Sequence, residues 1–159
     1  MKKKYLPVVI IISFFLIIFS LIEEPTQDLT SEGIQNIRYV KIAGQSIKVD
    51  LALTKDAQNM GLSGREALDS DEGMLFVFKY STSHPFWMKD MNFPIDIIWI
   101  SEDFKIVYIK KSAQPESYPE VYEPKGKGQY SRYVLEVVAG FAEKNNLKVG
   151  DKIENFVSP

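Results

Sequence analysis

Cysteine is absent from this 159-residue chain, and histidine occurs once, at His84. The lack of cysteine excludes disulfide bonds, thiol nucleophiles, thiolate metal sites and lipid attachment through a cysteine. A single histidine excludes a metal site built from several histidines. The chain also has no G-x-S-x-G, Walker or G-x-G-x-x-G motif. We therefore expect neither a metal nor another cofactor, and no familiar catalytic motif remains.

Hydrophobic residues make up 45% of the sequence and aromatic residues 13%, which is enough to build a core. The length corresponds to one domain. Without Lys2, Lys3 and Lys4, the rest of the chain carries 16 basic and 21 acidic side chains, a net charge of −5. Because a nucleic-acid binder needs a basic stripe, this acidic body predicts no nucleic-acid partner.

An uncharged run from Tyr5 to Ile22 follows the three lysines, and Glu23 and Glu24 end it. As a helix, such a run reaches about 27 Å, close to the thickness of the hydrocarbon core. The basic flank places the N-terminus on the cytoplasmic side and the rest of the chain outside. Residues 1–22 are thus predicted to be a single transmembrane helix, with the membrane as its partner.

Signal cleavage is the alternative for this segment. Ser20-Leu21-Ile22 fits a signal peptidase poorly, since Ile22 is large and branched. We therefore expect an uncleaved anchor in the cell membrane, whereas cleavage would secrete the domain. Residues 23–36 are polar and contain Pro and Gly, so we interpret them as a linker. Residues 37–157 would then form one extracytoplasmic domain.

The domain is predicted to be mainly β, an antiparallel sandwich or a barrel-like fold with one or two short helices. Residues 38–42 and 47–53 alternate around Ala43-Gly44-Gln45-Ser46, as in a hairpin. Thr54 is a suitable N-cap for a helix over 55–60 that Gly61 would end. The pattern shows no βαβ alternation. Further strands are expected over residues 73–78, 94–100, 105–110, 133–138 and 152–157, with a second helix over 140–146.

The stretch from His84 to Asp96 has the highest density of chemically versatile side chains. Trp87 could offer a stacking face, with Asp90 as a polar contact, and this combination suits a sugar or another polar ring. The alternative is core packing by the aromatic and methionine side chains, with solvated charges between them. A lone histidine followed by Pro85 is more typical of a loop than of a metal site.

Asp96 and Glu136 each interrupt an apolar strand. A buried carboxylate must find hydrogen-bond donors, because burying an unpaired charge is very costly. The two residues could act as general acid and base, as in glycoside cleavage, if their carboxyl groups lay about 5–9.5 Å apart in an open cleft. The alternative is that one of them pairs with Arg65 or Arg132 in a structural salt bridge.

Several sequence motifs, and the order in which they follow one another, resemble those of the domain of unknown function 192 family, which comprises short prokaryotic proteins. The resemblance covers about residues 38–157, and the departures are Ser63, where the family usually has Met, and Asp90, where Asn also occurs. It implies a mainly β, sandwich-like domain that is often exported or anchored, and it implies no activity. The matching motifs are 61-GLSGR-65, 73-GMLFVF-78, 86-FWMKDM-91, 94-PIDI-97, 134-VLEV-137, 139-AG-140 and 150-GD-151.

Three functions remain open from the sequence. The favoured one is a non-enzymatic binding module for a small polar or glycan ligand. The second is an assembly partner of an envelope protein, with an apolar patch near Phe86 and Phe93. The third is a glycan hydrolase or lyase that uses Asp96 and Glu136. The candidate binding residues are Arg65, Trp87, Lys89, Asp90, Asp96 and Glu136.

Overall fold

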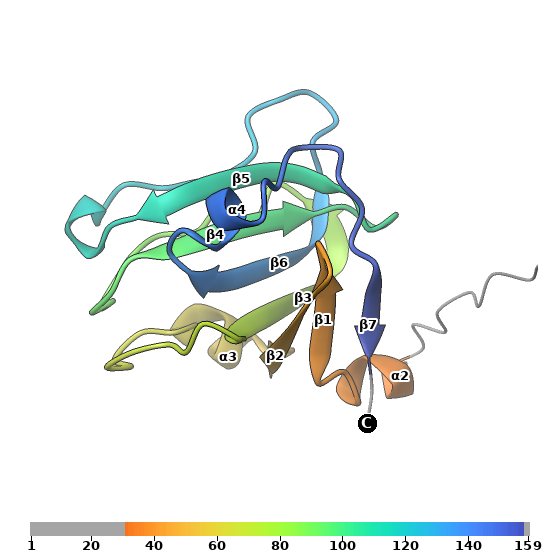
Figure 1. Cartoon of the computed structure of the whole chain (residues 1–159). Coiled ribbons are helices and arrows are strands. Elements are labelled where there is room, and N and C mark those ends of the chain that lie inside the picture. The colour runs from red at the N-terminus through yellow and green to blue at the C-terminus, as the bar shows by residue number, and fades with distance from the viewer. Residues whose placement is uncertain (1–30, 158–159) are drawn as a thin grey trace, which may run out of the picture.

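The computed structural model describes residues 31–157, with side chains from Gly33 onward. This part of the chain forms one seven-stranded sheet in the order β5-β4-β6-β3-β2-β1-β7 (Figure 1). The strands are β1 (Tyr39–Ile42), β2 (Gln45–Ala52), β3 (Glu72–Thr82), β4 (Ile95–Ile100), β5 (Ile106–Ala113), β6 (Ser131–Val138) and β7 (Asn155–Val157). The helices are α2 (Ser31–Gln35), α3 (Lys55–Met60), the 3-10 turn η1 (Pro115–Ser117) and α4 (Phe141–Lys144).

The predicted hairpin is confirmed. Ile42 pairs directly with Gln45, so Ala43 and Gly44 form a two-residue turn between β1 and β2. Both turn residues have positive φ, which is typical of the turns that match the twist of an antiparallel pair. The predicted helix cap is confirmed as well, because the Thr54 hydroxyl accepts the Ala57 amide proton at 3.2 Å.

The fold is mainly β, as predicted, but the prediction of an antiparallel sandwich or barrel-like fold needs two corrections. The described strands form a single open sheet rather than two packed sheets. Strands β2 and β3 are parallel, with Val49 opposite Gly73, and α3 lies in the connection between them. This connection is a βαβ unit: the sequence predicted its helix over 55–60, but not the parallel pairing of the strands on either side. The other strand pairs are antiparallel.

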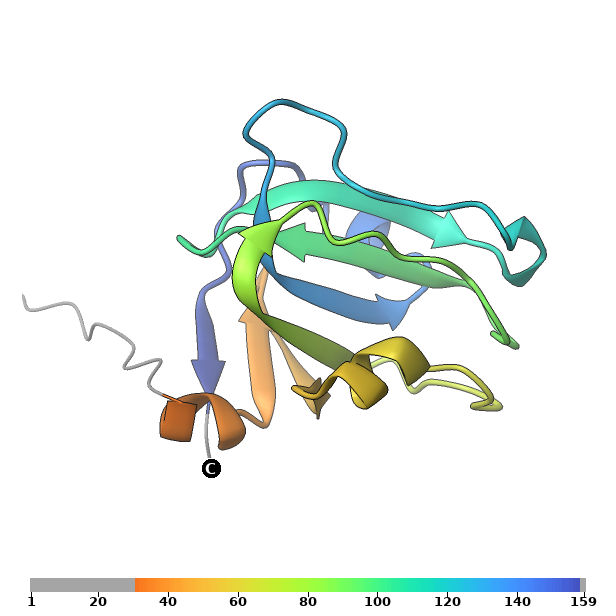
Figure 2. The same ribbon diagram turned by 180° about the vertical axis from the view of Figure 1, so that it is seen from behind.

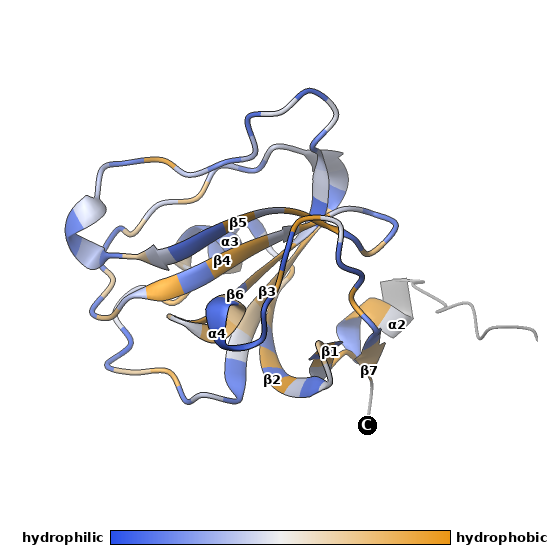
Figure 3. Ribbon diagram, turned by 45° about the horizontal axis from the view of Figure 1, so that its top comes forward, coloured by the Kyte–Doolittle hydropathy of each residue, from blue (hydrophilic) through white to orange (hydrophobic). Residues whose placement is uncertain are grey.

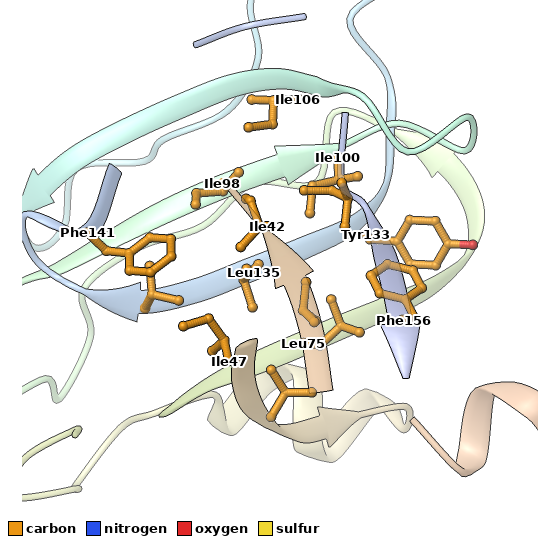
Figure 4. Packing of buried hydrophobic residues seen from close by; sticks show 14 of the residues in the cluster. Ile42, Ile47, Leu75, Ile98, Ile100, Ile106, Tyr133, Leu135, Phe141 and Phe156 are labelled. Carbon is orange, nitrogen blue, oxygen red and sulfur yellow. The ribbon is translucent and has the colours of Figure 1, made fainter. Parts of the chain in front are cut away.

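The sheet curves until the chain before β7 meets the start of β5. Ile106 donates its amide proton to Asp151 at 2.8 Å, and Ile153 donates to Phe104 at 2.8 Å. The curved inner face encloses one apolar cluster, which includes Ile42, Leu135 and Phe156 (Figure 4). Burial of these side chains is the main stabilising contribution on this face.

The second face of the sheet carries a separate apolar cluster. Phe76, Trp99 and Val134 belong to it, and the 61–71 and 83–94 segments cover it. Figure 2 shows α3 and the segment between β3 and β4 on this face, while α4 lies on the opposite side. Figure 3 shows hydrophobic colour along much of β4, and hydrophilic colour in many connections and in the last part of the edge strand β5. The central strands are therefore buried on both faces, which explains their nearly continuous apolar sequences.

The predicted transmembrane helix and most of the predicted linker lie outside the described residues. The end of that linker forms α2, a helix of five residues. Among the helices of the described part, none is long and apolar enough to cross a bilayer.

Candidate ligand pocket

A pocket of about 320 Å³ opens on the second face of the sheet. Its floor comes from β3 and β6, and its walls come from α3, the residues that follow this helix, and the 84–91 segment. On this face, α3 and the 83–94 segment lie in front of the sheet (Figure 2). The pocket is lined by Lys55, Gln58, Asn59, Met60, Gly61, Leu62, Ser63, Phe76, Phe78, His84, Pro85, Phe86, Trp87, Met91 and Glu136.

Glu136 is the acidic residue of the floor. It lies in the centre of β6, directly between Met74 on β3 and Ile97 on β4. The residue is only 4% exposed, and its Oε2 atom has no hydrogen-bond partner. Burial raises the pKa of Glu136 to about 8, and the nearby Arg65 charge lowers this pKa only in part. The carboxyl group is therefore mainly neutral at pH 7 and can donate a proton to a hydrogen bond.

Gly61 gives this carboxyl group its access to the pocket. The residue ends α3 with φ 53° and ψ −135°, a conformation that favours glycine. A Cβ atom at this position would lie 3.4 Å from the Phe76 ring and 3.7 Å from Glu136 Oε2. A larger side chain would thus fill the space above the carboxyl group.

Interlocked aromatic rings build one wall of the pocket. Phe76 and Phe86 meet edge to face with their centroids 4.8 Å apart, and Phe78 stacks on His84 at 3.5 Å. The His84 Nε2 atom lies 2.9 Å from the Tyr80 carbonyl oxygen, so this nitrogen carries the proton. Burial lowers the pKa of His84, which keeps the ring neutral. These ring contacts pack the wall of the pocket together.

The rim of the pocket exposes two large apolar side chains. Met60 at the end of α3 is 66% exposed, and Trp87 is 44% exposed. Single exposed apolar residues are common on monomeric proteins, and here two of them lie on the rim of one cavity. Trp87 was predicted from the sequence, whereas Met60 was not.

Lys89 and Asp90 shape the rim through their backbones rather than their side chains. The Lys89 carbonyl accepts the Ser63 hydroxyl proton at 2.8 Å, and the Asp90 carbonyl accepts the Gly64 amide proton at 2.8 Å. The Asn92 side chain also donates to the Arg65 carbonyl at 2.8 Å. These bonds fix the 61–65 segment against the 89–92 segment. Neither Lys89 nor Asp90 lines the pocket, and both side chains are exposed.

Asp96 lies outside the pocket, on the inner face of the sheet, and it is fully buried. Its Oδ1 accepts the Ser112 amide proton at 2.8 Å, and its Oδ2 accepts the Ala142 amide proton at 2.7 Å. The expectation that this buried carboxylate must find donors is confirmed. Both donors are backbone amides, so Asp96 joins β5 and α4 to β4.

The predicted salt bridge of Asp96 or Glu136 with an arginine is wrong. Arg65 donates to Asp50 at 2.7 Å, and Arg132 donates to Glu102 at 2.8 Å. Arg65 lines a separate depression of about 20 Å³ next to Gly73. It therefore influences Glu136 through its charge alone.

Asp96 and Glu136 also do not form the acid and base pair of a glycan hydrolase. In the sheet register, Asp96 pairs with Val137, and both side chains point to the inner face. Glu136 pairs with Ile97, and both side chains point to the second face. The sheet itself separates the two carboxyl groups, so they cannot act on one bond. The hydrolase or lyase prediction from Asp96 and Glu136 is therefore wrong.

The patch predicted for an assembly partner also differs from the structure. Phe86 is only 8% exposed, and Phe93 is partly buried against the apolar cluster of the second face. The exposed apolar side chains of this region are Met60 and Trp87 instead. Sequence reasoning missed Met60, Gly61 and Phe78 as pocket residues, because only the βαβ connection brings α3 next to the 84–91 segment.

Solved structures resemble this domain. A protein of unknown function from Novosphingobium aromaticivorans DSM 12444 has a TM-score of 0.66 and 30% identity, covering 74% of this chain and 82% of that chain. A protein from Sinorhizobium meliloti 1021, described as a candidate transcription regulator, has a TM-score of 0.64 and 29% identity, covering 74% of this chain and 90% of that chain. No curated protein matches the chain.

The family resemblance noted in the sequence is confirmed over nearly the whole described domain. The profile of the DUF192 family, which is described as Uncharacterized ACR, COG1430, matches residues 38–155. This range begins just before β1 and ends at the start of β7, so it includes the sheet and every wall of the pocket. The chain therefore belongs to the DUF192 family.

Proposed function

We propose that this domain is a non-enzymatic binding module for a small ligand, and that the pocket above Glu136 is its binding site. One observation carries the proposal: the unpartnered, buried Oε2 atom of Glu136 lines an open cavity whose rim exposes Trp87. A buried polar atom without a partner costs free energy. A ligand that bonds to this atom recovers that cost on binding.

The size and the lining of the pocket support a small ligand. Its volume of about 320 Å³ lies at the lower end of the range of ligand sites. Six of its fifteen lining residues are phenylalanine, tryptophan or methionine, and six others carry polar side chains. Asn59 and Glu136 can give orientation, while the aromatic side chains give contact area. This combination suits a small polar ligand with a ring, and a glycan unit belongs to that class.

The location of the domain is part of the same proposal. The basic and apolar character of residues 1–22 supports a single membrane anchor, with the domain on the extracytoplasmic side. Ligands there would come from the envelope or the medium. The acidic net charge of the body of the chain supports the view that nucleic acid is not its partner.

A thermal-shift screen of the full-length protein in a mild detergent tests the proposal. The panel should hold monosaccharides, glycan fragments, amino acids, nucleosides and amines. At 100 times its dissociation constant, a ligand adds about 2.7 kcal/mol to the free energy of unfolding. For a domain of this size, that is a shift of about 10 °C in Tm. A hit that disappears in Trp87→Ala supports the pocket as the site.

The matched control is Tyr80→Ala. Tyr80 is also an exposed aromatic residue, at 67%, but it does not line the pocket. This variant should keep the ligand-induced shift. A panel without any hit, or a hit that Trp87→Ala leaves unchanged, would reject the pocket as a binding site.

An assembly partner of an envelope protein is the second candidate function. Met60 and Trp87 support this function, because both are exposed at the rim of the pocket and methionine and aromatic side chains are enriched in protein interfaces. Photo-crosslinking from position 60 in intact cells separates the two functions. A single crosslinked protein that is lost in Trp87→Ala, together with a flat ligand screen, would favour the assembly function.

A further inference from the structure

The chemistry of the pocket floor narrows the class of ligand. We propose that the ligand carries a protonated amine on a compact apolar body, and that the ammonium group pairs with the Glu136 carboxyl group below the aromatic wall. This inference rests on the binding function proposed above. It names the charge and the shape of the ligand, which that function leaves open.

Glu136 lacks a counter-ion within the described structure. The Arg65 charge lowers the pKa of Glu136, but the Arg65 guanidinium bonds to Asp50 at 2.7 Å and does not bond to Glu136. Met74 and Ile97, its neighbours across β3 and β4, are both apolar. An ammonium group would supply the missing opposite charge and a donor for Oε2.

The aromatic wall is the second feature that favours a cation. Phe76, Phe78, Phe86 and Trp87 line the pocket. The face of such a ring carries partial negative charge, which attracts a desolvated ammonium group and repels a carboxylate. Because the carboxyl group and the rings belong to different elements, they are two separate features that select the same charge.

The other charged and titratable groups around the pocket do not provide an alternative partner. Lys55 lies in the exposed first turn of α3, at the edge of the lining, where water screens its charge. His84 is neutral, and its Nε2–H group is bonded to the Tyr80 carbonyl. Glu136 is thus the acidic residue of the lining, among the residues that the structure describes.

Binding of this ligand must release a proton. In the free protein at pH 7, Glu136 is mainly protonated, since burial raises its pKa to about 8. The ammonium group keeps its own protons and pairs with the ionised carboxylate. The Glu136 proton therefore leaves to the solvent, and one proton is released for each bound ligand that finds the acid protonated. Affinity should then rise with pH until the pH reaches about 8.

Three probes with one ring and different charges test this inference. Benzylamine, benzyl alcohol and benzoate are titrated calorimetrically into the full-length protein in mild detergent at pH 7. We expect benzylamine to bind at least about tenfold more tightly than either analogue. Titrations in phosphate and in Tris, which differ in ionisation enthalpy, should report release of close to one proton.

Variants identify the group responsible. Glu136→Gln keeps the shape of the side chain but cannot ionise, so the preference for the amine and the proton release should both disappear. Glu66→Gln is the control, since Glu66 is an exposed carboxylate that does not line the pocket. This control should bind benzylamine as the wild type does. A melting curve confirms that each variant is folded.

Several results would overturn the inference. Failure of benzylamine to bind, binding without proton release in the wild type, or an unchanged preference in Glu136→Gln would each reject it. Tighter binding of benzyl alcohol or benzoate would reject the cationic ligand and keep the binding module. If the broad screen and this series both found no ligand, the proposed function would fail together with the inference.

Discussion

The side chains of Asp96 and Glu136 lie on opposite faces of one sheet, although Asp96 is paired with Val137, the direct neighbour of Glu136. The alternation of side chains along a strand produces this separation, and it gives the two carboxyl groups different surroundings. Asp96 accepts two backbone amide protons, whereas Glu136 Oε2 accepts none. Asp96 therefore has a structural role, and Glu136 is available for a ligand.

Asp96→Asn should lower the free energy of unfolding by about 3 kcal/mol, because an amide cannot accept both backbone protons and leaves a buried donor unpaired. Urea denaturation at pH 7 measures this loss. Asp71→Asn, a change at an exposed position, should stay within about 0.5 kcal/mol of the wild type. A loss in Asp96→Asn no larger than that of the control would contradict the structural role of Asp96.

Stability should depend on pH through Glu136. Because its folded pKa is raised from 4.5 to about 8, the protonated acid favours the folded state. This contribution is complete below the ordinary carboxyl pKa and is lost as the pH rises to about 8. Between pH 6.5 and 8, the unfolding constant should therefore increase by up to about tenfold per pH unit. Denaturation curves at several pH values measure this slope.

Glu136→Gln provides the control for that slope. The variant cannot ionise at position 136, so its unfolding constant should stay nearly flat in the same pH window. His84 has an opposite effect that is largest below its ordinary pKa of 6.5 and fades as the pH rises to 8, because burial lowers its folded pKa. Equal slopes in the wild type and the variant would show that Glu136 is not the group that titrates.

Arg65→Gln should move the Glu136 titration to higher pH. The Arg65 charge lowers the pKa of Glu136, so its removal makes ionisation of the buried acid harder. The pH at which stability stops falling should rise above about 8. Arg132→Gln removes an equivalent charge that pairs with Glu102, and it should leave that pH unchanged. The loss of the exposed Arg65–Asp50 pair itself should cost less than about 1 kcal/mol.

The local elements of the fold could be predicted because their signals are local. The Ala43-Gly44 turn and the Thr54 cap each depend on a few adjacent residues. The parallel pairing of β2 with β3 could not be predicted in the same way. It depends on how the residues after Gly61 pack across the sheet, and α3 has only six residues to signal the crossover.

The candidate site was predictable in part for a similar reason. A carboxyl residue inside an apolar strand stands out in the sequence, so Glu136 and Asp96 were found. Which face each occupies depends on strand register, which sequence alone did not give. Lys89 and Asp90 were predicted as side-chain contacts, yet their backbone carbonyls have the structural role.

Gly73→Ala should destabilise the protein more than an ordinary glycine substitution. Gly73 has an extended conformation that alanine tolerates, but an added Cβ would lie 2.6 Å from the Glu136 carbonyl oxygen. The β3–β6 pair must therefore separate at the floor of the pocket, at a cost of about 3 kcal/mol. Gly128→Ala is the control: its positive φ strains alanine by about 1 kcal/mol, and its Cβ meets nothing within 4 Å. Urea denaturation compares the two variants, and a Gly73→Ala loss no greater than the Gly128→Ala loss would contradict the close approach of β3 to the Glu136 backbone.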